Sequence, residues 1–84
     1  MKDMLCTAAS NILSDFKAPI DATVIKRLKE KGAIILGKTN MDEFGMGSFG
    51  RYGFGDKKII RNPINEEYFA GGSSAGSAVA VRAD

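Results

Sequence analysis

Between residues 22 and 31, apolar and polar side chains recur with the spacing of an amphipathic α-helix. Asp21 directly precedes this segment. Its carboxylate can accept hydrogen bonds from the free N–H groups of the first turn, so it is the predicted N-cap. Gly32 fits the position just after the helix, where a positive φ is favoured. The apolar side is formed by Ala22, Val24, Ile25 and Leu28, and the polar side by Lys26, Lys29 and Glu30.

The next four residues, 33–36, form a short apolar run bounded by glycines, which is typical of a buried β-strand. Residues 40–70 are irregular and rich in glycine, with one predicted helical turn over 41–44. A last helix is predicted over 75–82, capped by Ser73 or Ser74, and its Ala- and Val-rich composition on all sides predicts burial. The pattern indicates an α/β fold with a long Gly-rich loop.

The composition is that of one small globular domain. Of the 84 residues, 44% are hydrophobic and 26% are charged, and the net charge of +2 argues against nucleic acid or an anionic membrane as a partner. No apolar run reaches the roughly 18–20 residues of a membrane span. Because Cys6 is the single cysteine and histidine is absent, an internal disulfide and a zinc site are excluded, and a reducing compartment is the simpler expectation.

The sequence matches the consensus of two phosphate-binding loops, but the order of the predicted helices and strands argues against both. Residues 32–39 satisfy GxxxxGK[ST], yet a helix precedes them and a strand forms their middle, the reverse of a P-loop. The simpler interpretation is a strand that ends at Gly37, followed by an exposed Lys38. Residues 45–50 satisfy GxGxxG, yet a loop separates them from the strand and more loop follows.

The segment GGSSAGS, residues 71–77, leads directly into the last predicted helix. Taken alone, it is explained about equally well as an ordinary Gly/Ser-rich helix start. As a functional site, its glycines let the backbone approach a reacting centre, a serine supplies a hydroxyl, and the helix N-terminus supplies positive potential. The order of the other motifs decides between these two interpretations.

Four motifs occur in a set order along the chain: Lys2-Asp3, GKTNMDEFGMGS over 37–48, Asn62-Pro63 and GGSSAGS over 71–77. In this order they closely resemble the amidase-signature family, and the likeness runs along the whole chain. The resemblance implies an α/β fold with helices packed on a mixed sheet. Residues 1–84 are expected to form one part of that domain, truncated at both ends.

The family hydrolyses amides with a Ser–cis-Ser–Lys triad, and the resemblance assigns two of its members here. Lys2 matches the lysine and Ser73 the bridging serine, whereas the nucleophilic serine belongs to a later Gly-Gly-Ser element beyond residue 84. Ser73 is expected to relay a proton between the nucleophile and a desolvated, neutral Lys2, with a cis peptide bond after Gly72 aiming the Ser73 hydroxyl. Lys2 itself is expected to be frayed. Supporting or substrate-binding roles are expected for Met46, Gly47, Ser48, Gly71, Gly72 and Ser74.

The sequence departs from the family pattern in three places. The usual KDN reads Lys2-Asp3-Met4, and Ala75 replaces a glycine of the usual GGSSGGS. The sequence of residues 65–69, NEEYF, resembles that of fungal mitochondrial members. This implies a mitochondrial location, with the cytoplasm as the alternative.

The resemblance also implies a function, that of an amidase subunit that releases ammonia from glutamine. In that branch of the family, a B subunit uses the ammonia with ATP and Mg²⁺ to convert Glu-tRNA(Gln) into Gln-tRNA(Gln). A small third subunit completes the complex, tRNA binds only through the complex, and the amidase subunit needs no cofactor. The alternatives are a generic small-amide amidase of the same family, a catalytically inactive fragment or interaction module, and a P-loop nucleotide binder. Residues 1–84 alone are expected to be inactive.

Overall fold

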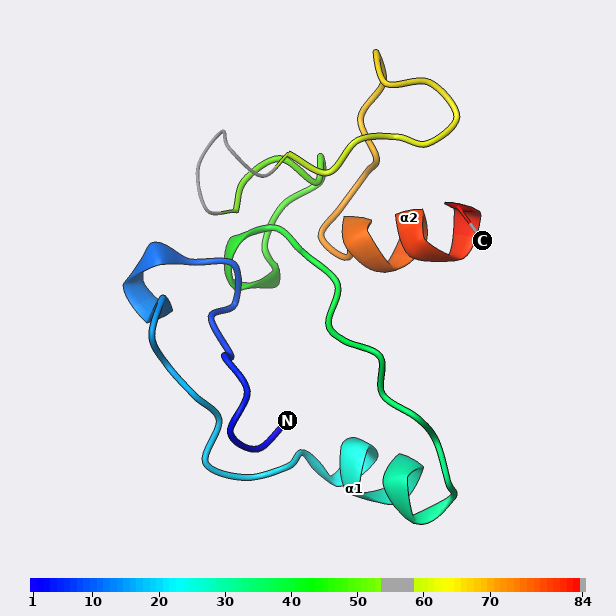
Figure 1. Cartoon of the computed structure of the whole chain (residues 1–84). Coiled ribbons are helices and arrows are strands. Elements are labelled where there is room, and N and C mark those ends of the chain that lie inside the picture. The colour runs from blue at the N-terminus through cyan, green and yellow to red at the C-terminus, as the bar shows by residue number, and fades with distance from the viewer. Residues whose placement is uncertain (54–58, 84) are drawn as a thin grey trace.

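The computed structural model describes residues 1–53 and 59–83, where two α-helices and two 3₁₀ helices are joined by extended segments (Figure 1). In chain order the elements are η1 (Asn11–Leu13), α1 (Thr23–Glu30), η2 (Glu43–Gly45) and α2 (Ala75–Ala83). Strand-like pairing within these residues is limited to isolated bridges, so the predicted mixed sheet does not occur in this part of the chain. None of the helices in the described ranges has the length and apolar character to cross a membrane.

The amphipathic helix α1 forms where the pattern predicts it, but Asp21 is not its N-cap. The cap position is held by Ala22, which makes no side-chain hydrogen bond. The Asp21 carboxylate instead accepts from Lys29 Nζ at 2.8 Å and from the Lys2 backbone N–H at 2.7 Å. These donors, one of them charged, replace the first-turn N–H groups as partners of Asp21. Gly32 follows the helix with φ +83°, as predicted.

The Asp21 contacts make the attachment of the N-terminal segment to α1 sensitive to acid. The hydrogen bond from Lys29, and then the one from the Lys2 N–H, lower the pKa of Asp21. A lowered pKa means that the stabilisation is fully present above the unfolded value of about 3.9 and is lost as the pH falls through the lower folded value. We expect the protection of the Lys2 amide, measured as its exchange rate relative to an unprotected amide at the same pH, to be lost below about pH 4. Comparison with Asp21→Asn, in which this pH dependence should disappear, checks the assignment.

The apolar run 33–36 is neither a strand nor buried, so this prediction is wrong. Ile34 is 85% exposed and Leu36 is 97% exposed. Together with Ile25 and Leu28 of α1, the run lines an open groove of about 540 Å³. A strand becomes regular and buried only when a neighbouring strand pairs with its backbone and other elements cover its faces, and the described residues supply neither.

The N-terminal segment is more ordered than the sequence predicts. Lys2 forms a parallel bridge with Ala18, and Leu5 forms an antiparallel bridge with Lys17. Backbone hydrogen bonds of 2.7–3.1 Å join residues 3–6 to residues 16–18. The expectation that Lys2 is frayed is therefore wrong for its backbone, because residues 16–18 pair with it and Asp21 accepts its N–H.

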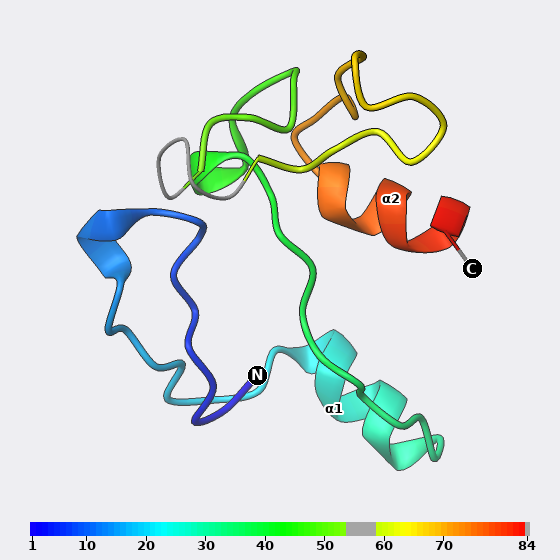
Figure 2. The same ribbon diagram turned by 45° about the horizontal axis from the view of Figure 1, so that its top comes forward.

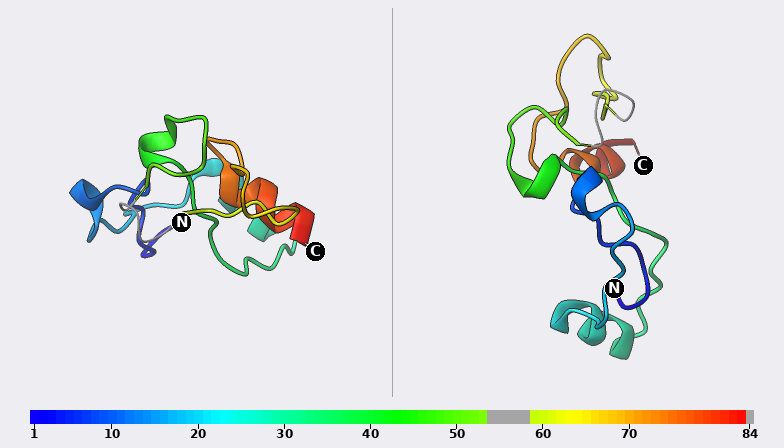
Figure 3. Two further views of the ribbon diagram at one scale, coloured as in Figure 1. Left: turned by 90° about the horizontal axis from the view of Figure 1, so that it is seen from above. Right: turned by 90° about the vertical axis from the view of Figure 1, so that its left-hand side faces the viewer.

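The molecule is a slab of 40 × 31 × 17 Å with little interior (Figures 2 and 3). Its accessible surface of 6469 Å² is about a third larger than expected for a folded monomer of this size. The buried apolar residues in the described ranges are Ala9, Ala18 and Ala75. The predicted burial of the last helix is wrong, since Ala75 is the one buried residue of α2 and Val81 is 82% exposed. An all-round apolar helix needs cover on every side, and here it is covered only at its start.

Candidate active site

Two of the motifs that carry the family resemblance lie side by side. Residues 39–42 run antiparallel to residues 73–77 and are joined to them at three points, which brings GKTNMDEFGMGS against the start of α2 (Figure 1). The joined pairs are the Thr39 and Ser77 hydroxyls at 2.9 Å, the Gly76 N–H and the Asn40 carbonyl at 3.1 Å, and the Asp42 N–H and the Ser73 carbonyl at 3.0 Å.

Asp42 organises the loop that follows it. Its side chain is completely buried, and its carboxylate accepts from the Tyr52 N–H at 2.9 Å and from the Gly50 N–H at 3.1 Å. Charge-assisted bonds of this kind offset the cost of burying the carboxylate. We call residues 42–52 the Asp42 loop. The backbone of Asp42 is extended, with φ −67° and ψ 151°, so the helical turn predicted over 41–44 forms at Glu43–Gly45 instead.

Glycines let the backbone pack directly on this carboxylate. A Cβ at Gly72 would overlap Asp42 Oδ2 and lie 3.0 Å from the Gly50 nitrogen. A Cβ at Gly47 would lie 2.5 Å from the same oxygen. In the antiparallel contact between residues 39–42 and residues 73–77, a Cβ at Gly76 would overlap the backbone of Asn40. A side chain at Gly72 or Gly76 would therefore push the two motifs apart, and one at Gly47 would crowd Asp42 within its own loop.

An aromatic contact holds the Asp42 loop to the segment that leads into GGSSAGS. The rings of Phe49 and Phe69 lie 4.9 Å apart between centroids, within the range of favourable aromatic pairs. Phe49 also contacts Tyr52 edge-on, with centroids 6.1 Å apart. We call residues 69–77 the serine segment. The Asp42 loop and the serine segment are thus joined by side chains as well as by the Asp42 backbone.

The bond between Gly72 and Ser73 is cis, so this prediction is confirmed. Ser73 is half-buried, and its hydroxyl makes no hydrogen bond within residues 1–53 and 59–83. The carbonyl of Ser74 accepts from the Ser77 and Ala78 N–H groups and so begins α2. Neither Ser73 nor Ser74 caps the helix with its hydroxyl in this part of the chain, contrary to the prediction.

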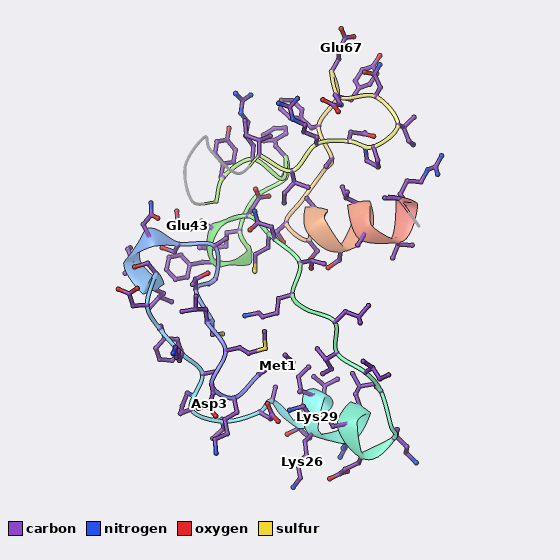
Figure 4. The ribbon with its side chains drawn as sticks, in the orientation of Figure 1. Met1, Asp3, Lys26, Lys29, Glu43 and Glu67 are labelled. Carbon is purple, nitrogen blue, oxygen red and sulfur yellow. The ribbon has the colours of Figure 1, made fainter. Side chains whose placement is uncertain are left out.

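Lys2 is not brought to Ser73 within the described residues. Its side chain is exposed, and no hydrogen bond or ion pair joins its ammonium group to any described residue. Met1 and Asp3, which flank it, lie toward α1 and away from the start of α2 (Figure 4). The desolvation that a neutral, catalytic Lys2 requires is therefore not supplied by this part of the chain.

The remaining predicted site residues lie in or beside the Asp42 loop. Met46 is 73% exposed, Ser48 is exposed, and Gly47 contacts the Asp42 carboxylate. Gly71 precedes the cis bond with φ +82°, a conformation that glycine adopts without strain. Gly71 and Gly72 adjoin Ser73 in the chain, and the predicted part of all these residues in substrate binding stays a prediction.

The structure adds two buried residues that the sequence did not single out, Asp42 and Ser10. Ser10 is 0% exposed; its hydroxyl donates to Glu43 Oε1 at 2.6 Å and accepts from the Ile12 N–H at 3.2 Å. The Phe44 N–H also donates to the Ala8 carbonyl at 2.8 Å, so the N-terminal segment is fixed to the Asp42 loop. The sequence did contain one indication of these contacts, which is the acidic pair Asp42-Glu43 inside a Gly-rich motif.

No group of three or more carboxylate, thiol or imidazole side chains that could hold a metal ion occurs in the described ranges. What the site offers is a serine hydroxyl on a closely packed backbone of glycines. Its charged component is the buried Asp42 carboxylate, which is already bonded on both oxygens.

Comparison with known proteins gives the class to which this site belongs. The family model described as Amidase matches residues 1–84, and the chain therefore belongs to the amidase family.

Among the relatives are bacterial proteins named as the A subunit of glutamyl-tRNA(Gln) amidotransferase. The chain is 56% identical over 81 residues to that of Borrelia garinii, covering 96% of the chain and 16% of the relative. It is 58% identical over 85 residues to that of Lachnoclostridium phytofermentans, covering 100% and 17%. It is 53% identical over 93 residues to that of Syntrophobacter fumaroxidans, covering 100% and 18%. The chain thus spans about a sixth of the length of these relatives. Because all three are bacterial, they lend no support to the mitochondrial location.

Proposed function

We propose that residues 1–84 form part of the catalytic core of a glutamine-hydrolysing amidase, the A subunit of a glutamyl-tRNA(Gln) amidotransferase. The observation that carries this proposal is the antiparallel contact between residues 39–42 and residues 73–77. It brings the longest motif of the family resemblance against the serine that the same resemblance assigns to the triad. The names of the relatives, at 53–58% identity, support the choice of the A subunit.

In this proposal Ser73 relays a proton between Lys2 and a nucleophilic serine supplied from outside residues 1–84. The nucleophile attacks the side-chain amide carbon of glutamine, and the nitrogen leaves as ammonia after it gains a proton. Water then hydrolyses the acyl-enzyme to glutamate. The glycines at 71 and 72 let the backbone approach the reacting centre.

The ammonia is then used by a B subunit with ATP and Mg²⁺, in a complex that contacts the tRNA and includes a small third subunit. The amidase subunit itself contributes no cofactor in this scheme. A complex of several subunits is consistent with the word subunit in the names of the bacterial relatives.

The proposal is tested with a chimera, because the chain is about a sixth of the relatives' length. Residues 1–84 replace the matched segment of the Borrelia garinii relative, and release of ammonia from glutamine is measured on the purified protein. The chimera is expected to hydrolyse glutamine. Lys2→Ala is expected to lower kcat by about 10⁴-fold or more, because the nucleophile loses its base.

Lys17→Ala is the matched control, since it removes another exposed lysine of the N-terminal segment. It is expected to change kcat by less than about twofold. An equal fall in kcat in the two variants, or an unchanged kcat in Lys2→Ala, would contradict the proposed role of Lys2. Hydrolysis of small amides without hydrolysis of glutamine would favour a generic amidase.

A further inference from the structure

We infer that Asp42 is a positioning residue for Ser73: it holds the Gly72–Ser73 backbone from both sides, and its buried carboxylate makes one rigid unit of the Asp42 loop and the serine segment. The inference rests on the proposed function, because it assigns to Asp42 a part in the reaction that Ser73 serves. It concerns a residue that makes no contact with the reacting atoms and acts through the backbone.

The first step of the argument is that Asp42 reaches both residues of the serine pair with different atoms. Its backbone N–H donates to the Ser73 carbonyl at 3.0 Å. Its carboxylate oxygen Oδ2 lies so close to Gly72 that a Cβ there would overlap it. One residue therefore fixes the backbone before and after the Ser73 nitrogen.

The second step is that the carboxylate cannot move away from Gly72. Oδ1 is bonded to the Tyr52 N–H at 2.9 Å and Oδ2 to the Gly50 N–H at 3.1 Å. Gly47 limits the space on the loop side, where a Cβ would lie 2.5 Å from Oδ2. The side chain is completely buried, so water does not compete for these bonds.

The third step is that the neighbouring acidic residue, Glu43, does not share the role of Asp42. Glu43 follows Asp42 directly, but its side chain accepts from Ser10 and so connects η2 to the N-terminal segment. No hydrogen bond joins its side chain to residues 71–74 among the described residues. The two acids of the motif therefore have separable tasks, and Glu43 provides a matched control.

The test uses Asp42→Asn in the chimera that carries residues 1–84. Asparagine keeps the shape, but its NH₂ group must face one of the two N–H donors, so one hydrogen bond is lost. A displacement of the Ser73 hydroxyl of about 1 Å is expected to lower kcat for glutamine by about 10²-fold. KM is expected to change by less than about twofold, because the completely buried Asp42 offers no surface to a substrate. Hydrogen–deuterium exchange in peptides covering residues 69–77 is expected to rise as well.

Glu43→Gln keeps an acceptor for Ser10 and is expected to leave both kcat and the exchange of residues 69–77 unchanged. If Asp42→Asn fails to fold, Gly47→Ala serves as the second variant, because its Cβ crowds Oδ2 without removing the charge. It is expected to lower kcat by about tenfold or more and to raise the exchange of residues 69–77. A kcat within about twofold of the unmodified chimera in Asp42→Asn would overturn the inference.

Failure of the proposed function has a different signature. A chimera that folds but does not hydrolyse glutamine contradicts the proposed function, and the exchange measurement then decides the inference alone. Faster exchange of residues 69–77 in Asp42→Asn, and not in Glu43→Gln, supports the positioning of Ser73 by Asp42. Unchanged exchange in both variants overturns it.

Discussion

Ser73→Ala in the chimera is expected to lower kcat for glutamine hydrolysis by about 10⁴-fold, with little change in KM. In the proposed mechanism the Ser73 hydroxyl is the path by which the proton moves between Lys2 and the nucleophile. An interaction used only in the transition state lowers kcat when it is removed and leaves substrate binding nearly unaffected. Steady-state kinetics of ammonia release measure both quantities.

The same change is expected to leave stability almost unaltered. The Ser73 hydroxyl makes no hydrogen bond within the described residues, and its backbone contact to Asp42 is kept in alanine. Ser14→Ala is the control, because Ser14 is an exposed serine that lies directly after η1. Retention of more than about a tenth of the activity in Ser73→Ala would contradict the assigned role.

Gly72→Ala is the second change with a large expected effect, and it acts through packing. The added Cβ overlaps Asp42 Oδ2 and presses on the Gly50 and Phe49 nitrogens, all of which belong to a closed loop. Insertion of a methyl group into such a site costs about 1–3 kcal/mol of the free energy of unfolding. Because Ser73 moves with Gly72, kcat is also expected to fall by about 10²-fold or more. Thermal unfolding and kinetics of the chimera measure the two effects.

Two other glycines separate this clash from the general effect of replacing glycine. Gly37→Ala adds a methyl group with no atom within 4 Å and is expected to be neutral or slightly stabilising. Gly71→Ala also meets no neighbour, but its φ of +82° disfavours alanine by about 1 kcal/mol. Equal free energies of unfolding in Gly72→Ala and Gly37→Ala would contradict the packing explanation.

The features that the sequence predicted correctly are local ones. The helix at 23–30 follows from its apolar spacing, Gly32 from the need for a positive φ, and the start of α2 from the Gly/Ser-rich segment before it. The cis bond at Gly72–Ser73 was expected from the family resemblance alone. Spacing or composition could not have indicated it, because the conformation of one peptide bond has no periodic signature.

The wrong predictions concern burial and partners. Residues 33–36 and α2 have the composition of interior elements, yet Leu36 and Val81 are largely exposed, since the described residues supply too little surface to cover them. Asp21 was predicted to cap a helix, but it accepts from Lys29 and Lys2 instead. A sequence pattern indicates that a residue needs a partner, but it does not say which of several donors comes within reach.

The Asp42 contacts also determine the order in which the site can assemble as the chain is synthesised. The bonds from the Asp42 carboxylate to Gly50 and Tyr52 span 8 and 10 residues, so they can form as soon as this short loop has emerged. The bond to the Ser73 carbonyl requires closure of a far longer loop, whose entropic cost is higher and which contributes no native contact until it closes. The Asp42 loop is therefore expected to form first and the serine segment to dock onto it later. Amino acid changes within residues 42–52 should then slow the acquisition of activity after synthesis more than changes within α2.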